Sequence, residues 1–156
     1  MADSITAPPS RLRTQALVDA MMRTLLRTPL LHRLLSAKLL IITVIGRKSG
    51  REYVNPVGYA EHDGQLLIGT AAGWRRNLRE GEPVRITWRG RSVDADWEVV
   101  SGEERLVEPY RIILSHNPTH GRFAGIALDS DGRVIREQLR RAVERGTVVV
   151  RLRPRI

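Results

Sequence analysis

The chain has 156 residues, of which 42% are hydrophobic and 28% charged, a composition that suits one globular domain with a buried core. It contains no cysteine, which excludes disulfides, thiolate metal sites and a cysteine nucleophile. The 26 lysines and arginines outnumber the 17 acidic residues and give a net charge of +9, so we expect an anionic partner such as a multiply charged ligand, a membrane surface or nucleic acid.

The N-terminal region predicts a short disordered tail over residues 1–10, followed by one domain over residues 11–156. A first helix is expected over about 11–27, and a second, shorter helix begins at Pro29. We expect both helices to pack on their own domain. Because arginines line their polar sides, peripheral contact of residues 11–38 with an anionic membrane is the alternative. The cysteine-free sequence without a signal peptide favours a cytoplasmic protein.

From residue 39 onward the pattern changes to short β-favouring segments separated by turns. The predicted strands are 39–45, 53–60, 65–70, 84–89, 92–100 and 147–153. Pro56 indicates an edge strand or a bulge. The connection from Ala71 to Glu82 is expected to hold one helical turn. Short turns between the strands favour an antiparallel, closed sheet and an α+β, mainly β fold.

Two later helices complete the predicted fold. The sequence Ser101-Gly102-Glu103-Glu104 has the pattern of a capping box and opens a helix to about Ser115. A last helix is expected to start at Ser130 or Asp131 and to end at Gly146.

Two basic segments could bind an anionic cofactor. The first, Gly46-Arg47-Lys48-Ser49-Gly50-Arg51, places three cations and a hydroxyl in a turn whose backbone amides can point at an anion. The second runs from Gly69 to Leu78 and combines small residues, which let a flat ligand approach the backbone, with Trp74 as a stacking face and Arg75 and Arg76 as charges. A solvated hairpin tip and a half-buried tryptophan would give the same patterns.

Taken in order, these motifs resemble the deazaflavin-dependent nitroreductase family. The resemblance rests on Gly-Arg-Lys-Ser-Gly, then Asn55-Pro56, then the small-residue strand end, then Trp74-x-x-Asn77-Leu78. It implies a flavin-reductase-like split β-barrel that binds the 8-hydroxy-5-deazaflavin coenzyme F420, and an actinobacterial source. The activity it implies is hydride transfer from the reduced coenzyme to a quinone, a nitro compound or an activated alkene. Split barrels of this kind are often dimers, so a homodimer is a further expectation.

The resemblance also implies a set of cofactor-binding residues. Arg47, Lys48 and Ser49 would contact the coenzyme phosphate, with Asn55 and Pro56 nearby and Arg51 in place of a basic residue that the family often has at Tyr53. The ring would lie along Thr70, Ala71, Ala72 and Gly73, and Trp74, Arg75 and Asn77 would complete the pocket.

Tyr110 and His116 are the predicted catalytic residues, with His120 nearby, because Tyr and His can give a proton to the substrate. The spacing of the two histidines also suits a metal, but no acidic or cysteine partner accompanies them, so no metal site is expected.

Several alternatives stay open. The same barrel could use flavin mononucleotide, or could carry a cofactor or an anionic lipid without catalysis. Ala71 and Ala72 favour a non-catalytic module, because related proteins often have Ser-Lys there. Nucleic-acid binding is not expected, since aromatic residues make up 4% of the chain and are not interleaved with the arginines.

Overall fold

A computed structural model describes residues 16–20 and 39–156, and the structural statements below concern these residues. Residues 16–20 are helical, in agreement with the first predicted helix, and Val18 in this helix is buried. The predicted tail and the second helix lie outside the described residues. In the described part of the chain, no helix has the length and apolar character needed to cross a membrane.

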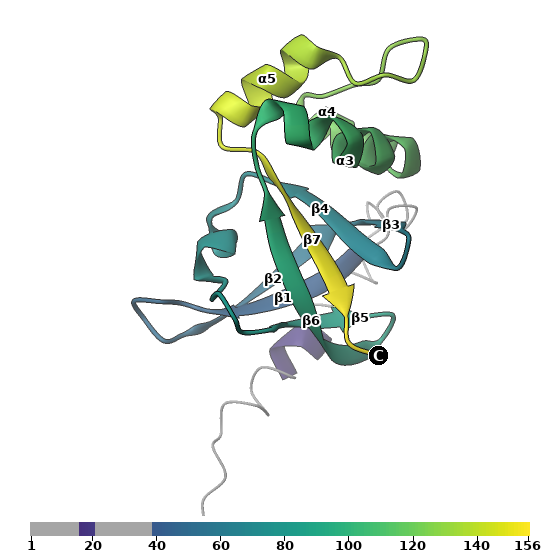
Figure 1. The fold of residues 1–156 in the computed structure, drawn as a ribbon. Helices are drawn as coiled ribbons and strands as arrows, with labels where there is room; N and C mark the ends of the chain where they lie inside the picture. Colours follow the sequence, from purple (N-terminus) through teal and green to yellow (C-terminus); the bar gives the residue numbers. More distant parts are fainter. Residues whose placement is uncertain (1–15, 21–38) are drawn as a thin grey trace, which may run out of the picture.

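Seven strands form one antiparallel sheet that curls into a split β-barrel (Figure 1), which confirms the predicted fold class. The strands follow one another in space in the order β2-β1-β5-β6-β7-β4-β3. Their bounds are β1 (Leu39–Ile45), β2 (Glu52–Gly58), β3 (Ala60–His62), β4 (Gln65–Thr70), β5 (Val84–Trp88), β6 (Arg91–Val100) and β7 (Val148–Pro154).

The predicted strand 53–60 is in fact two strands, β2 and β3, which are separated at Tyr59. β2 lies at one edge of the sheet and β3 at the other. Pro56 therefore lies on an edge strand, opposite Ile41 of β1, where the missing amide of proline disrupts no further neighbour. This placement confirms the edge-strand prediction.

Four helical segments connect or cover the strands: η1 (Gly73–Asn77), α3 (Glu103–His116), α4 (Pro118–Ala124) and α5 (Arg136–Glu144). In Figure 1, α3, α4 and α5 gather at one end of the sheet, while η1 lies beside the hairpin formed by β1 and β2. The short helix α4 was not predicted. It begins because the side-chain oxygen of Asn117 accepts a hydrogen bond from the amide of His120, and because proline suits the first turn.

The predicted capping box at Ser101 is wrong. The residue that precedes α3 is Gly102, whose φ of 91° suits glycine, and no side chain caps the helix. Glu104, which a capping box would turn back toward the helix start, instead forms an ion pair with Arg136 of α5.

The predicted start of the last helix is also wrong. α5 begins at Arg136, because the carboxylate of Asp129 accepts hydrogen bonds from the amides of Asp131 and Arg133 and so forms a turn. Leu128 and Val134 then pair in an isolated β-bridge before the helix.

The core has two parts because β4 and β7 bury side chains on both of their faces. Leu66 and Ile68 of β4 lie in the barrel interior with Leu152 of β7, whereas Leu67 packs with Val149 against α3 and α5. The alternation follows from the two-residue period of a strand. Gly69 therefore belongs to the face of β4 that the helices cover, and Thr70 to the barrel face.

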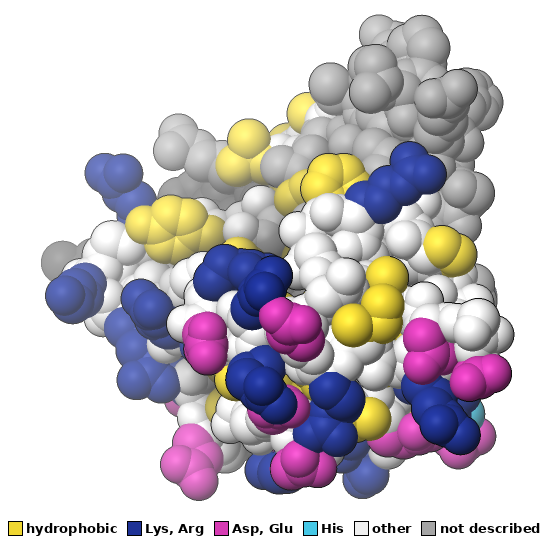
Figure 2. Space-filling view, turned by 90° about the horizontal axis from the view of Figure 1, so that it is seen from above, with side chains coloured by type: hydrophobic (Ala, Val, Ile, Leu, Met, Phe, Trp, Pro, Cys, Tyr) yellow, Lys and Arg dark blue, Asp and Glu magenta, His cyan; other side chains and the backbone are white. Residues whose placement is uncertain are grey.

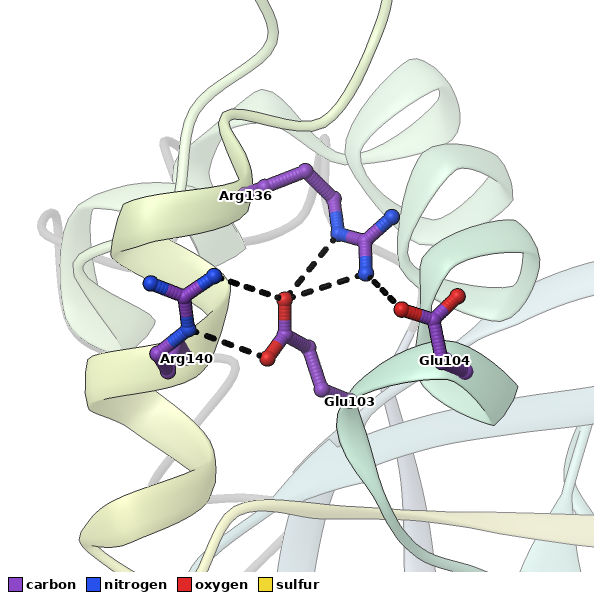
Figure 3. A network of polar contacts seen from close by, with 4 residues as sticks. All are labelled: Glu103, Glu104, Arg136 and Arg140. Carbon is purple, nitrogen blue, oxygen red and sulfur yellow. Dashed lines mark hydrogen bonds and ion pairs between the residues drawn. The ribbon is translucent and has the colours of Figure 1, made fainter.

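A polar network joins α3 to α5 outside this second core (Figure 3). The carboxylate of Glu103 accepts hydrogen bonds from Arg136 at 3.0 Å and from Arg140 at 3.1 Å, and Glu104 pairs with the same Arg136. The hydrogen bond from Arg140, followed by that from Arg136, lowers the pKa of Glu103 below its ordinary value of 4.5.

The stability of the fold should decrease when the carboxylate of Glu103 is protonated. A carboxyl group whose pKa is lowered by folding stabilises the folded state above its unfolded pKa, and this contribution is lost as the pH falls through the lower, folded pKa. We therefore expect the free energy of unfolding to decrease on acidification below about pH 4.5. In the Glu103→Gln variant this decrease should be smaller, as urea unfolding at several pH values can show. The same pH dependence in the variant and in the unmodified protein would contradict this role of Glu103.

Candidate functional site

The two basic segments lie against each other, and Arg47 holds them together. Its amide donates a hydrogen bond to Oδ1 of Asn77 at 3.2 Å, and its guanidinium donates to the carbonyl of Leu78 at 2.7 Å. The turn that carries Arg47 is closed by hydrogen bonds from the Gly46 amide to the Arg51 carbonyl and from the Gly50 amide to the Gly46 carbonyl. The structure thus brings together parts of the chain that are thirty residues apart.

Four cations around this contact are available to an anion. Lys48 and Arg51 lie in the hairpin turn, and Arg76 and Arg79 lie in or just after η1. All four are exposed and none forms an ion pair with another described residue. By contrast, over the helical end in Figure 2, cations and carboxylates lie next to each other. We refer to Lys48, Arg51, Arg76 and Arg79 as the cation cluster.

The predicted stacking residue Trp74 is a core residue instead. Its side chain is 8% exposed and packs in the barrel interior with Leu78, four residues later. Arg75 is likewise occupied, because its guanidinium donates a hydrogen bond at 3.1 Å to the carbonyl of Gly146, just after α5. The expectation that Trp74 and Arg75 line a pocket is therefore corrected: the first closes the barrel and the second fixes η1 to the turn before β7.

The remaining hairpin residues mostly stabilise the hairpin itself. The hydroxyl of Ser49 accepts a hydrogen bond from the Arg51 amide and lies 3.3 Å from the Tyr53 hydroxyl. The Asn55 amide bonds to the Tyr53 carbonyl of its own strand. Arg51 precedes β2, so it is in the turn and not on the strand face where the sequence placed it. Lys48 and Arg51 are exposed cations of the hairpin turn, and neither forms an ion pair with another described residue.

Thr70, Ala71, Ala72 and Gly73 form an open backbone segment between β4 and η1. The hydroxyl of Thr70 accepts a hydrogen bond from the Ala72 amide at 3.0 Å, and Ala71 to Gly73 are exposed. A Cβ added at Gly73 would have no atom within 4 Å. The segment has room for a flat ligand against its backbone, and it leads directly to η1 and the cation cluster.

A cavity of about 600 Å³ adjoins the contact between the hairpin and η1. It lies where β1 ends and β5 begins, and Asn77, Leu78 and Arg79 form one of its walls. Three carboxylates, those of Glu52, Glu82 and Asp94, also line it. An anionic ligand is therefore better accommodated on the cation cluster than inside this cavity.

Tyr110 lies beside His120, and not beside the predicted His116. Their rings are 5.8 Å apart, and a Cβ on Gly69 would lie 2.4 Å from the Tyr110 hydroxyl and 2.7 Å from Nε2 of His120. Burial raises the pKa of Tyr110 and lowers that of His120, so both groups are uncharged at neutral pH. Among the described residues, neither the Tyr110 hydroxyl nor Nε2 of His120 has a hydrogen-bond partner.

His116 is exposed, and its Nδ1 hydrogen bonds to the carbonyl of Ile112 in its own helix at 2.8 Å. The structure does not bring His116 to Tyr110, and a catalytic role of either residue stays a prediction. Among the residues that the structure describes, no group of three or more His, Cys, Asp or Glu side chains is arranged to hold a metal ion.

Comparison with known proteins gives one family match and several similar folds. The model of the F420H2-dependent quinone reductase family matches residues 14–124. No curated protein matches the chain. A putative 5-nitroimidazole antibiotic resistance protein from Bacteroides thetaiotaomicron is 13% identical with a TM-score of 0.53, covering 79% of this chain and 76% of its own.

Two further solved structures are similar. The conserved hypothetical protein Rv2991 from Mycobacterium tuberculosis is 20% identical with a TM-score of 0.50, covering 78% of this chain and 75% of its own. An F420-H2 dependent reductase is 16% identical with a TM-score of 0.49, covering 74% of this chain and 93% of its own. At these identities the structures of TM-score 0.50 and above bear on the fold alone, and they agree with the barrel described above.

Gly69 should be essential for the packing of Tyr110 and His120. A methyl group in the Gly69→Ala variant would collide with both side chains, so we expect a loss of about 1–3 kcal/mol in the free energy of unfolding. The matched Gly73→Ala variant, with open space around its Cβ, should change stability by less than about 0.5 kcal/mol. Chemical denaturation of both variants measures the difference, and equal effects would contradict the close approach at Gly69.

Proposed function

Because the chain belongs to the F420H2-dependent quinone reductase family, we propose that it transfers a hydride to a hydrophobic acceptor such as a quinone, a nitro compound or an activated alkene. Family membership makes the protein an oxidoreductase that depends on coenzyme F420. The observation that supports the proposed site is the cation cluster, which has no ion-pair partners in the described part of the chain. The acceptor is the part of the function that remains a proposal.

The residues at the site fit the coenzyme. A phosphodiester needs cations and hydrogen-bond donors that are not already paired, and Lys48, Arg51 and Arg76 meet this requirement. The ring needs an open backbone, which Thr70 to Gly73 provide. When bound, the coenzyme supplies the hydride, and the protein's part is to bind it, to orient it and to limit the access of water.

Arg47 contributes indirectly in this proposal. Its guanidinium and amide hold the hairpin against η1, so the charges of both segments are presented to one ligand. The contact fixes the spacing between Lys48 and Arg76 before the ligand arrives. Such preorganisation lowers the entropic cost of binding.

Flavin mononucleotide is an alternative cofactor for the same barrel, whereas a module without catalysis does not agree with membership of a reductase family. A homodimer, a cytoplasmic location and contact of residues 11–38 with a membrane stay predictions.

Coenzyme binding should depend on the cation cluster. Titration of the protein with oxidised coenzyme F420, followed by tryptophan fluorescence, should show saturable binding that is weakened at least tenfold in a Lys48→Ala/Arg76→Ala variant, because charged hydrogen bonds contribute about 1.5–3 kcal/mol each. Affinity should also fall as salt is raised.

A matched charge change supplies the control. Arg133 is exposed, lies in the turn before α5, and has no ion-pair partner among the described residues. The Arg133→Ala variant should bind the coenzyme as the unmodified protein does. Equal losses in both variants would show that net charge alone, and not the cation cluster, governs binding. Tighter binding of flavin mononucleotide would change the cofactor and keep the barrel.

A further inference from the structure

A second cavity, of about 400 Å³, lies between the loop that follows η1 and the strand β6. It is lined by residues 80–82 of the loop and residues 96–99 of the strand. Four of these residues are acidic and none is basic, in a chain whose net charge is +9. All four acidic residues are exposed, so the cavity is open to solvent and a ligand can enter it.

Backbone hydrogen bonds fix the loop that forms one wall of this cavity. The Glu82 amide donates to the Arg79 carbonyl at 3.1 Å and closes a turn, in which Gly81 has a φ of 78° that suits glycine. The indole N–H of Trp97 donates to the Glu82 carbonyl at 2.8 Å and so holds the turn against β6. The cavity is therefore formed before a ligand arrives, which lowers the entropic cost of binding.

Two of the four carboxylates have no ionic partner. Asp96 and Glu98 each pair with an arginine that lies in β7 or directly after it. Glu80 and Glu82 form no ion pair with any residue that the structure describes. A positively charged ligand would therefore meet two carboxylates whose charge is not already neutralised.

The lining of the cavity favours an extended organic cation. Among the described residues, the acidic side chains are not arranged to hold a metal ion, because no group of three or more His, Cys, Asp or Glu converges. The indole of Trp97 and the side chain of Val99 add apolar surface to the lining. An indole face attracts a cation and also packs against methylene groups. Ammonium groups separated by a short aliphatic chain match both the spread carboxylates and this apolar surface.

We infer that this cavity binds an aliphatic diamine or polyamine, with its ammonium groups at Glu80 and Glu82 and its methylene groups over Trp97. The site is separate from the cation cluster and requires neither the coenzyme nor the acceptor. Because both carboxylates are exposed, each ion pair contributes modestly, and binding should weaken as salt is raised.

The test follows Trp97 by NMR while the full-length protein, without added coenzyme, is titrated with the five-carbon diamine cadaverine. The chain has three tryptophans, and the indole N–H signal of Trp97 is the one that disappears in a Trp97→Phe variant. This signal should shift saturably with cadaverine. Pentylamine, with one charge, should bind about three- to fivefold more weakly, and the uncharged pentanediol should cause no saturable shift. Calorimetric titration should give the same order of affinity without any signal assignment.

A pair of matched variants separates the cavity from the charge of the whole protein. Glu80→Gln/Glu82→Gln should bind cadaverine about tenfold more weakly, since two exposed ion pairs are lost. Glu137→Gln/Glu144→Gln removes the same charge from exposed positions on α5 and should bind as the unmodified protein does. Equal losses in both variants, an equal affinity for pentanediol, or the absence of saturable cadaverine binding would each overturn the inference.

Discussion

The fold depends on strands that are buried on both faces. In β4, Leu66 and Ile68 face the barrel interior while Leu67 faces the helices, so a slip of one residue in register would exchange the two cores. The pairing of β4 with β7 fixes this register along five residue pairs. As a result, the chain leaves the strand at Thr70 toward the barrel face, while Gly69 remains under α3 and α4. The candidate site begins at this point, where the side chains change from the helix-covered face at Gly69 to the barrel face at Thr70.

The β-sheet could largely be predicted from sequence because its strands alternate and its turns contain glycine. β1 and β4 have the predicted bounds, and Pro56 correctly indicated an edge. The helix starts were harder to predict, since they depend on tertiary contacts. Glu104 has the spacing of a capping box, yet an arginine far along the chain binds it more favourably than the local amide does.

The sequence located the two basic segments of the candidate site but not the packing around them. The basic hairpin and η1 do meet, but sequence alone did not reveal which side of a five-residue helix faces the core. Trp74 in η1 and Leu78 directly after it are the large apolar residues of this segment, and both lie in the barrel interior. The contact of Tyr110 was not predicted either: Asn117 and Pro118 start a new helix, and its changed direction brings His120, and not His116, to Tyr110.

The segment η1 is held at two places by arginine, through Arg47 to the Leu78 carbonyl and through Arg75 to the Gly146 carbonyl. It thereby connects the hairpin to the turn that joins α5 to β7. Segments tied in this way open together, as one cooperative unit in hydrogen exchange. The mobility of η1, and with it of the cation cluster proposed to bind the coenzyme, is then set in part by the turn after α5. A sequence change near Gly146 could therefore alter how long a bound coenzyme resides without changing any residue that is proposed to contact it.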